Sequence, residues 1–182
     1  MLKSNDILDE KDKKLREKSI DVVFPLSSDE KKLIKEMQKF LKYSQIEEMA
    51  EKYNLRPGMG LAAIQLNIAK RFFVIVEELE NSTFRNYFFA NPKIISNSEE
   101  IIYAEAGEGC LSVNRDIEGI VPRYARVTVE AYDEEGKAFT IRLREEMSIA
   151  VQHEIDHLNG MLFYDRIDKK DPFNGMDKYR AI

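Results

Sequence analysis

Two histidines and a glutamate stand close together in residues 151–165, which read "VQHEIDHLNGMLFYD". The order H-E-x-x-H places His153 and His157 four residues apart, so on a helix both rings rise from one face, about 6 Å apart. Glu154, between them, has the chemistry to move a proton at a metal centre. A catalytic zinc-type site takes three protein ligands and an open position for water, so the motif predicts a metal centre that needs a third ligand.

The third ligand is not found downstream of this motif. One class of H-E-x-x-H peptidases takes a third histidine from a longer motif, but Phe163 occupies that position here. Another class takes a glutamate from a later helix, and no glutamate follows Glu154 in the sequence. The chain has 2 histidines, both inside the motif, so we expect the third ligand upstream.

Cys110 is the single cysteine of the chain, stands in "GEGCLSV", and as a thiolate is the best remaining ligand. Gly109 beside it permits the close backbone approach that a metal site often needs. A lone cysteine is most often an inert buried residue. That alternative would be preferred for Cys110 if the two histidines had another candidate for the third ligand. A rival hypothesis makes Cys110 a nucleophile with His153 or His157 as its base, but it leaves the second histidine and Glu154 without roles.

The helix that carries the histidines is predicted over residues 145–158 from their helical pattern. Ile149 and Ala150 precede His153 by 4 and 3 residues and lie on the same helical face, which indicates an apolar floor to the site. Asp156 points away from that face. We expect it to pair with a nearby arginine, with plain solvent exposure as the alternative.

The stretch "GMGLAAIQ", residues 58–65, matches the dinucleotide-binding pattern G-x-G-x-x-A. That fingerprint must follow a strand, whereas the residues before Gly58 are charged and helical in pattern. We therefore expect Gly58 and Gly60 to fold the backbone tightly beside a ligand and to place the Gln65 amide as a hydrogen-bond donor. A plain turn is the alternative.

The remaining elements predict how these residues are positioned. An amphipathic helix begins at a capping box formed by Ser27 and Glu30. The predicted strands are residues 71–78, 86–92, 101–106, 125–132 and 138–144, the last two forming a hairpin. A helix, several antiparallel strands and then the ligand helix predict an α+β fold, with the strands packed around a central metal-binding helix.

The bulk properties fit one ordinary domain, because 182 residues can bury a sizeable core, and we predict a single catalytic domain over residues 1–182. The formal charge is −5 and the basic residues are spread along the chain, so no nucleic-acid site is expected. No apolar run approaches a membrane span, and residues 1–19 mix acids with bases, unlike a signal or transit peptide. A single cysteine fits a reducing compartment, and we expect a cytoplasmic monomer.

Three motifs, "GMGLAAIQ", "EGCLS" and "QHEIDHLNG", resemble in this order the three signature motifs of the peptide deformylases along their full length. They bracket residues 58–160, over half of the chain. The segment after "EGCLSV" and the overall length resemble the longer, type 2-like branch of that family. The tail, residues 168–182, contains Pro172 and Gly175 and is not expected to form the long C-terminal helix of another branch.

The resemblance implies a metal-dependent hydrolase that removes the N-formyl group from the N-terminal formyl-methionine of newly synthesised polypeptides and releases formate. It implies that Cys110, His153 and His157 hold one divalent transition metal, ferrous iron in the cell. Residue types alone also suit zinc, nickel or cobalt. The implied partners are nascent formyl-methionyl peptides, with transient proximity to the ribosome and without a membrane.

The resemblance also implies roles for further residues. Glu154 would take a proton from water and return it to the leaving amine. The Gln65 side-chain amide and the Leu111 backbone N–H would stabilise the oxyanion, with Glu108 holding Gln65 in place. The expected substrate-binding residues are Met59, Gly60, Gly109, Ile149 and Ala150, of which Met59, Ile149 and Ala150 would form an apolar pocket for methionine.

Two other functions compete with this one at the level of sequence. A metal-dependent peptidase would use the same H-E-x-x-H chemistry on internal peptide bonds, and a nucleotide-binding module would use "GMGLAA". Metal analysis separates the nucleotide-binding module from the two metalloenzymes. Formate release from formyl-methionyl peptides separates the deformylase from the peptidase.

Overall fold

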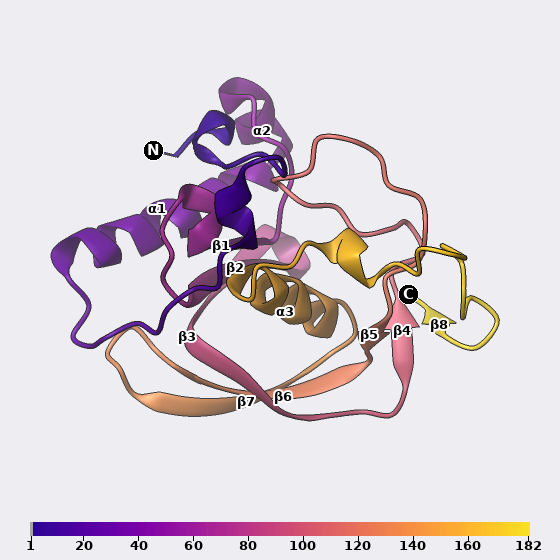
Figure 1. The fold of residues 1–182 in the computed structure, drawn as a ribbon. Helices are drawn as coiled ribbons and strands as arrows, with labels where there is room; N and C mark the ends of the chain where they lie inside the picture. The colour runs from indigo at the N-terminus through magenta and orange to yellow at the C-terminus, as the bar shows by residue number, and fades with distance from the viewer. Residues whose placement is uncertain (1) are drawn as a thin grey trace.

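Helices cover both faces of an antiparallel sheet in the computed structural model, which describes residues 2–182 (Figure 1). Within that range the larger sheet has 5 strands in the order β1-β2-β3-β6-β7. Its strands are β1 (Gly60–Ala62), β2 (Phe72–Leu79), β3 (Thr83–Asn97), β6 (Arg126–Tyr132) and β7 (Ala138–Arg144). The helix α1 (Ser28–Ser44) packs on one face and α3 (Glu145–Leu158) on the other, which confirms the predicted α+β class.

The strand β2 shows why the sheet needs cover on both faces. Phe72 and Val74 belong to the apolar core that contains α1 side chains. Phe73 and Ile75 belong to the core that contains α3 side chains. Because successive side chains of a strand point to opposite faces, the continuous apolar run in β2 is stable only between two layers.

The helix α1 begins as its sequence predicts. Ser27 Oγ accepts a hydrogen bond from the Glu30 backbone N–H at 3.2 Å, and the Ser27 backbone N–H donates to Glu30 Oε2 at 2.7 Å. These two bonds satisfy N–H groups that the first helical turn leaves without partners. A shorter helix, α2 (Glu47–Tyr53), follows before the chain enters β1.

The helix α3 has the bounds predicted from the sequence and lies at the centre of the molecule (Figure 1). Its side chains Met147, Val151, Ile155 and Leu158 pack on the sheet. Gly160, just beyond the helix, has φ of +74°, a left-handed conformation that glycine adopts without the strain of a Cβ. The sheet therefore holds one face of α3 and leaves the face with the two histidines for the site.

A second sheet consists of three short strands in the order β5-β4-β8 within the described range 2–182. These are β4 (Ile101–Tyr103), β5 (Arg123–Tyr124) and β8 (Arg180–Ala181). The strand predicted over residues 101–106 therefore ends at Tyr103. The tail forms turns and then β8, parallel to β4, so it contains no long helix over residues 168–182, as predicted.

Short 3-10 helices fill the connections between these elements. They are η1 (Ser4–Asp6), η2 (Lys13–Arg16), η3 (Ala63–Leu66), η4 (Glu80–Ser82) and η5 (Phe163–Arg166). The N-terminal segment crosses two of the predicted site loops: Leu8 N–H donates to Gln65 O at 2.8 Å, and Glu10 N–H donates to Ser112 O at 2.7 Å. The segment thus holds both loops in place through backbone hydrogen bonds.

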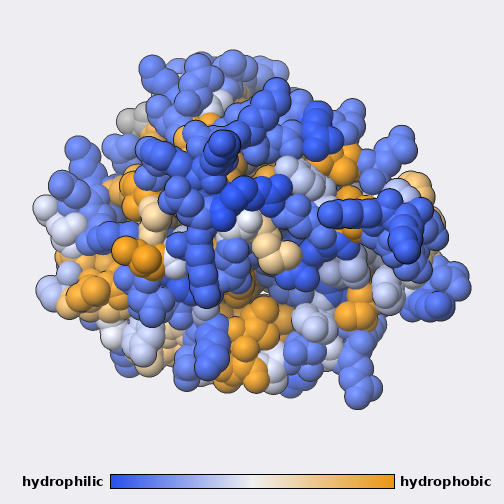
Figure 2. Space-filling model, in the orientation of Figure 1, coloured by the Kyte–Doolittle hydropathy of each residue, from blue (hydrophilic) through white to orange (hydrophobic). Residues whose placement is uncertain are grey.

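The surface agrees with the composition. Figure 2 shows one face that is mostly hydrophilic, with small separate hydrophobic patches. Within residues 2–182 no helix has the length and apolar character needed to cross a membrane.

Candidate active site

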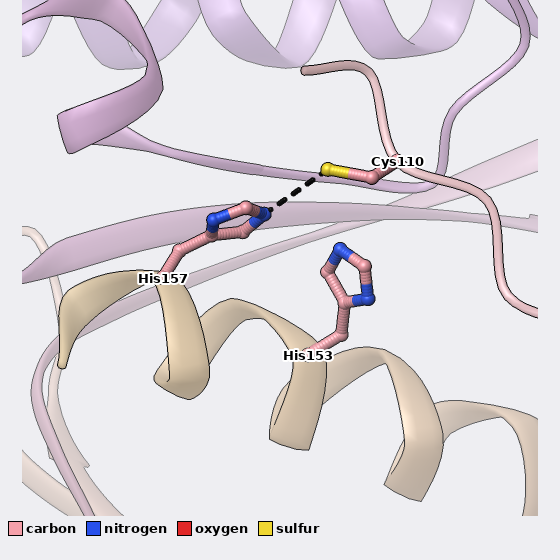
Figure 3. Close-up of side chains that lie close together, drawn as sticks. All are labelled: Cys110, His153 and His157. Carbon is pink, nitrogen blue, oxygen red and sulfur yellow. Dashed lines mark hydrogen bonds between the residues drawn. The ribbon is translucent and has the colours of Figure 1, made fainter. Parts of the chain in front are cut away.

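Cys110, His153 and His157 lie together, with one candidate ligand atom of each within 4.8 Å of the others. Cys110 Sγ is 3.3 Å from His157 Nε2, and the two imidazole ring centroids are 5.0 Å apart. Figure 3 shows the thiol reaching from its loop toward the two rings on α3. One sulfur and two nitrogens at this spacing fit a tetrahedral divalent metal with one position left open for water or substrate.

The orientation of His153 is set by Glu108. Its Nδ1 lies 2.8 Å from Glu108 Oε2, so Nε2 is left for the cluster. Burial raises the pKa of Glu108, but hydrogen bonds from Arg123 and His153 outweigh it and lower the pKa to about 2. Glu108 is therefore a carboxylate at neutral pH and accepts the proton of Nδ1. Such a carboxylate behind a histidine fixes the tautomer and the ring plane of a metal ligand.

The buried side chain of Arg123 joins Glu108 to α3. Arg123 is 1% exposed and donates two hydrogen bonds to Glu108, at 2.7 and 2.9 Å, and one to Asp156 at 2.5 Å. Asp156 also accepts two hydrogen bonds from Arg166, both at 2.6 Å. Asp156 is 3% exposed, so the expected arginine pairing is confirmed and the alternative of solvent exposure is wrong.

Glu154 lies against β1 with little room to spare. It is 4% exposed, and its Oε2 has no hydrogen-bond partner within residues 2–182. A Cβ on Gly60 would overlap Glu154 Oε1, so only glycine fits at that position without movement. Burial raises the pKa of Glu154 to about 7. The carboxyl group is thus positioned beside the ligand residues with one oxygen free to bond a water or a substrate.

Gln65 is held by its own helical turn. Its Oε1 accepts a hydrogen bond from the Ala62 N–H at 2.9 Å, so its Nε2 faces the loop that carries Cys110. Nε2 donates to Ser112 Oγ at 3.1 Å and lies 3.8 Å from Cys110 Sγ. The expectation that Glu108 holds Gln65 is wrong, because Glu108 bonds to His153 and Arg123. Ala62 and Ser112 perform that task.

The backbone of Leu111 is fixed by Arg56, a residue that the sequence motifs do not include. The Arg56 guanidinium donates to the Leu111 carbonyl oxygen and, at 3.0 Å, to the Val113 carbonyl oxygen. The Leu111 N–H donates to no acceptor in the part of the chain from residue 2 to residue 182. This leaves the amide available as a donor to a bound group.

A cavity of about 700 Å³ opens beside the cluster, between β1, the loop that carries Cys110, and α3. The predicted residues on its wall are Met59, Gly60, Gln65, Glu108, Gly109, Cys110, Leu111, Ile149, Ala150, His153 and Glu154. His157 is not among its lining residues. Its Nε2 lies 3.3 Å from Cys110 Sγ, so it belongs to the ligand cluster without lining the cavity. Ile182 also lines the cavity, and no sequence motif pointed to it.

The secondary structure around "GMGLAAIQ" excludes a dinucleotide-binding site of the G-x-G-x-x-A type at these residues. Residues 58–65 run through β1 into η3 and are preceded by α2, whereas the fingerprint requires a strand before its glycines and a full helix after them. Gly58 and Gly60 instead lie beside Leu111 and Glu154 on the cavity wall.

Comparisons with known proteins give a consistent result. A family model described as "Polypeptide deformylase" matches residues 4–173. "Peptide deformylase" of Listeria monocytogenes serotype 4a (strain HCC23) is 49% identical over 94% of this chain and 94% of its own. "Peptide deformylase 2" of Bacillus anthracis is 46% identical over 100% of this chain and 99% of its own. The crystal structure of peptide deformylase from Thermus thermophilus is 35% identical, with a TM-score of 0.74 over 90% of this chain and 86% of that chain.

Proposed function

This chain belongs to the polypeptide deformylase family, and we propose that its Cys110–His153–His157 cluster and Glu154 carry the reaction of that family. It is a hydrolase that removes the N-formyl group from the formyl-methionine at the start of newly synthesised polypeptides. The observation that carries the proposal is the buried Glu154 Oε2, which has no partner in residues 2–182. Glu154 lies at the wall of a cavity that Cys110 and His153 also line, and these two residues cluster with His157.

Cys110, His153 and His157 would hold one divalent transition metal, and we propose ferrous iron in the cell. One thiolate with two imidazoles also suits zinc, cobalt and nickel. When bound, the metal supplies Lewis acidity that makes water easier to deprotonate and the formyl carbonyl easier to attack. Glu108 supports this site by holding the His153 ring so that Nε2 faces the cluster.

Glu154 is proposed to move the proton. It takes a proton from the attacking water, whose hydroxyl oxygen bonds to the formyl carbon. It then gives that proton to the methionine nitrogen, because an amide nitrogen leaves poorly unless it is protonated. The carbon–nitrogen bond breaks, and the products are formate and a peptide with a free amino group. The unpartnered Oε2 supports this role, since a buried carboxylate oxygen without a protein partner is available to accept a proton.

Gln65 and Leu111 are proposed to stabilise the oxyanion that develops on the formyl oxygen. The Gln65 amide has two N–H donors: one bonds Ser112 Oγ, and the other makes only a long contact of 3.8 Å with Cys110 Sγ, which a substrate oxygen would replace. The Leu111 N–H has no acceptor in the described residues, and the peptide group that carries it is held by the Val113 N–H, which donates to the Cys110 carbonyl oxygen at 3.1 Å. Donors that are fixed before the reaction stabilise developing charge without reorganisation.

The methionine side chain is proposed to enter the apolar part of the cavity. Methionine is unbranched and apolar, and Met59, Ile149 and Ala150 line the cavity near the ligand residues. Gly60 and Gly109 line it as well, where the missing side chain lets a peptide backbone come close.

We also propose that residues 1–182 form one catalytic domain that acts as a cytoplasmic monomer near ribosomes. The support is chemical, because formyl-methionyl chains occur where translation occurs and a single cysteine fits a reducing compartment.

The proposal is tested with the metal-loaded protein and three substrates. We expect formate release from a formyl-methionyl tripeptide and no cleavage inside an unformylated peptide. The matching acetyl-methionyl tripeptide should react at least about a hundredfold more slowly in kcat/KM, because its extra methyl displaces the carbonyl from its donors. Cleavage of internal peptide bonds without formate release would contradict the proposal and favour a metal-dependent peptidase.

A further inference from the structure

The active-site cavity extends along α3 for three helical turns. The α3 residues on its wall are His153 and Glu154, then Ile149 and Ala150, then Glu145 and Glu146. With a rise of 1.5 Å per residue, the first turn of α3 lies about 12 Å from His153. A methionine side chain that enters beside the ligand residues can run along this wall toward the first turn of α3.

The segment of residues 180–182, here named the strap, lies at that end. Arg180 and Ala181 pair in parallel with Ile102 and Tyr103. Beyond the strand, the Ile182 N–H donates to the Tyr103 carbonyl oxygen at 3.0 Å. The Ile182 carbonyl oxygen accepts from Glu105 N–H at 2.9 Å. Both backbone groups of Ile182 are therefore bonded, which fixes its backbone beside the cavity that this residue, 37% exposed, lines.

Arg180 ties the strap to α3. It donates two hydrogen bonds to the carboxylate of Glu145, at 2.9 and 2.8 Å, and a third to Glu100 at 2.8 Å. Such a two-bonded pair of a guanidinium with a carboxylate fixes direction as well as distance. Because Glu145 itself lines the cavity, Arg180 places the strap directly against the first turn of α3.

The wall beside Ile182 offers little bulk of its own. Ala104 and Gly107 line the cavity from the loop that follows β4, and Ala104 packs against the small apolar cluster that contains Ile149. A branched side chain at residue 182 supplies the volume that these small residues lack, and a β-branched residue is stiff about χ1. The family model match ends at residue 173, so the strap lies outside the matched region.

We propose that Ile182 forms the far wall of the pocket for the methionine side chain and limits the length of side chain that the enzyme accepts. This inference rests on the proposed placement of methionine along α3. One methylene in an apolar pocket changes kcat/KM by roughly 10- to 200-fold. A smaller side chain at residue 182 should therefore raise the relative kcat/KM of a substrate whose first side chain is one methylene longer.

The test compares formyl-methionyl-alanyl-serine with formyl-ethionyl-alanyl-serine, whose first side chain is one methylene longer. The measured quantity is the ratio of the two kcat/KM values, ethionyl over methionyl, by formate release. In Ile182→Ala we expect this ratio to rise at least about fivefold above that of the unaltered enzyme. Ile182→Val, which removes one methyl, should fall between the two. The control Ile95→Ala shortens an isoleucine that is 50% exposed on β3 and should leave the ratio unchanged.

Binding provides a second readout that does not depend on turnover. The dissociation constants of the products methionyl-alanyl-serine and ethionyl-alanyl-serine should shift in the same direction in Ile182→Ala. A ratio within about twofold of the unaltered enzyme, in a variant that keeps its metal and deformylates the methionyl substrate, would overturn the proposal. If the unaltered enzyme released no formate, the placement of methionine would be wrong, and the inference would fall with it.

Discussion

The carboxyl group of Glu154 is buried, yet its Oε2 has no hydrogen-bond partner in the part of the chain that the structure describes. Leaving a buried polar group without a partner costs about 1–3 kcal/mol, so folds rarely retain one without a reason. Here the reason is the site itself, because Gly60 makes room for the carboxyl group and the cavity can supply a water or substrate to bond it.

Glu154→Gln should keep the metal and lose most turnover. Glutamine has nearly the same shape, and Glu154 is not among the three ligands, so metal content should stay at that of the unaltered protein. Loss of proton transfer should lower kcat by about 10²- to 10⁴-fold. Metal analysis and formate release on one preparation measure both quantities. Glu130→Gln, which removes a carboxylate from an exposed position on β6, is the control, and a near-normal kcat in Glu154→Gln would contradict the role of Glu154 as base.

Between elements, the buried Arg123 links the loop that carries Cys110 to α3. It extends from β5, and its guanidinium contacts a carboxylate from the cysteine loop and another from α3. Taking three charged groups out of water is costly, and the arrangement is stable only while each charge is paired. The network thus holds the loop with Glu108 at a fixed distance from the helix with His153.

Arg123→Met should destabilise the protein strongly. The variant removes the arginine that pairs with Glu108, and it leaves Asp156 with Arg166 as its one remaining arginine partner. Breaking a buried ion pair typically costs about 3–5 kcal/mol of unfolding free energy. Urea unfolding of the metal-free protein measures this loss. Arg126→Met is the matched control, because its pair with Glu100 is 38% exposed on both sides and should contribute at most about 1 kcal/mol. Equal effects of the two substitutions would show that the network is not important for stability.

The start of α1 offers a test of a purely local interaction. Ser27→Ala removes the hydroxyl that accepts the Glu30 N–H and should lower the unfolding free energy by about 1 kcal/mol. Ser28→Ala, one residue later and inside the helix, should change it by less than about 0.5 kcal/mol. Urea midpoints of the two variants, measured side by side, compare the two losses of stability. A larger loss in Ser28→Ala would contradict the assignment of Ser27 as the capping residue.

At the scale of the whole molecule, ion pairs hold segments from both ends of the chain to its centre. Glu10 pairs with Arg115, and Arg180 of the strap pairs with Glu100 and Glu145. The hydrogen bond from Arg115 lowers the pKa of Glu10, and those from Arg180 lower the pKa of Glu100 and Glu145. Each carboxylate therefore releases its proton more readily in the folded than in the unfolded chain.

Stability should consequently fall in acid. Because the folded-state pKa values are lowered, the contribution of these groups is fully present above the unfolded value of about 4.3. It is lost as pH falls through the folded-state values, where the unfolded chain binds more protons. Urea unfolding from pH 7 to pH 3 should show this decline, and a combined Glu100→Gln and Glu145→Gln variant should show a shallower one. The same slope in both proteins would mean that other carboxylates cause the acid response.

Much of the fold near the site follows from the sequence alone. The bounds of α3, the capping box of α1 and the hairpin of β6 and β7 depend on residues close together in the chain, and periodicity or capping chemistry reveals such elements. The turn between β2 and β3 also has a local signal: Asn81 and Ser82 adopt φ of 61° and 55°, and asparagine tolerates that conformation well. Of the strands around it, β2 keeps its predicted length, and β3 is longer than predicted because pairing in the sheet extends it.

The three candidate metal ligands were also readable from residue types, since two histidines one helical turn apart need a third partner and the chain offers one cysteine. The partners of these residues were not. Only the tertiary structure shows that Glu108 bonds His153 rather than Gln65, that Arg123 links it to Asp156, and that Ile182 reaches the cavity. Contacts of this kind join segments far apart in the chain, and they depend on sheet register and loop packing, which no local pattern of residues encodes.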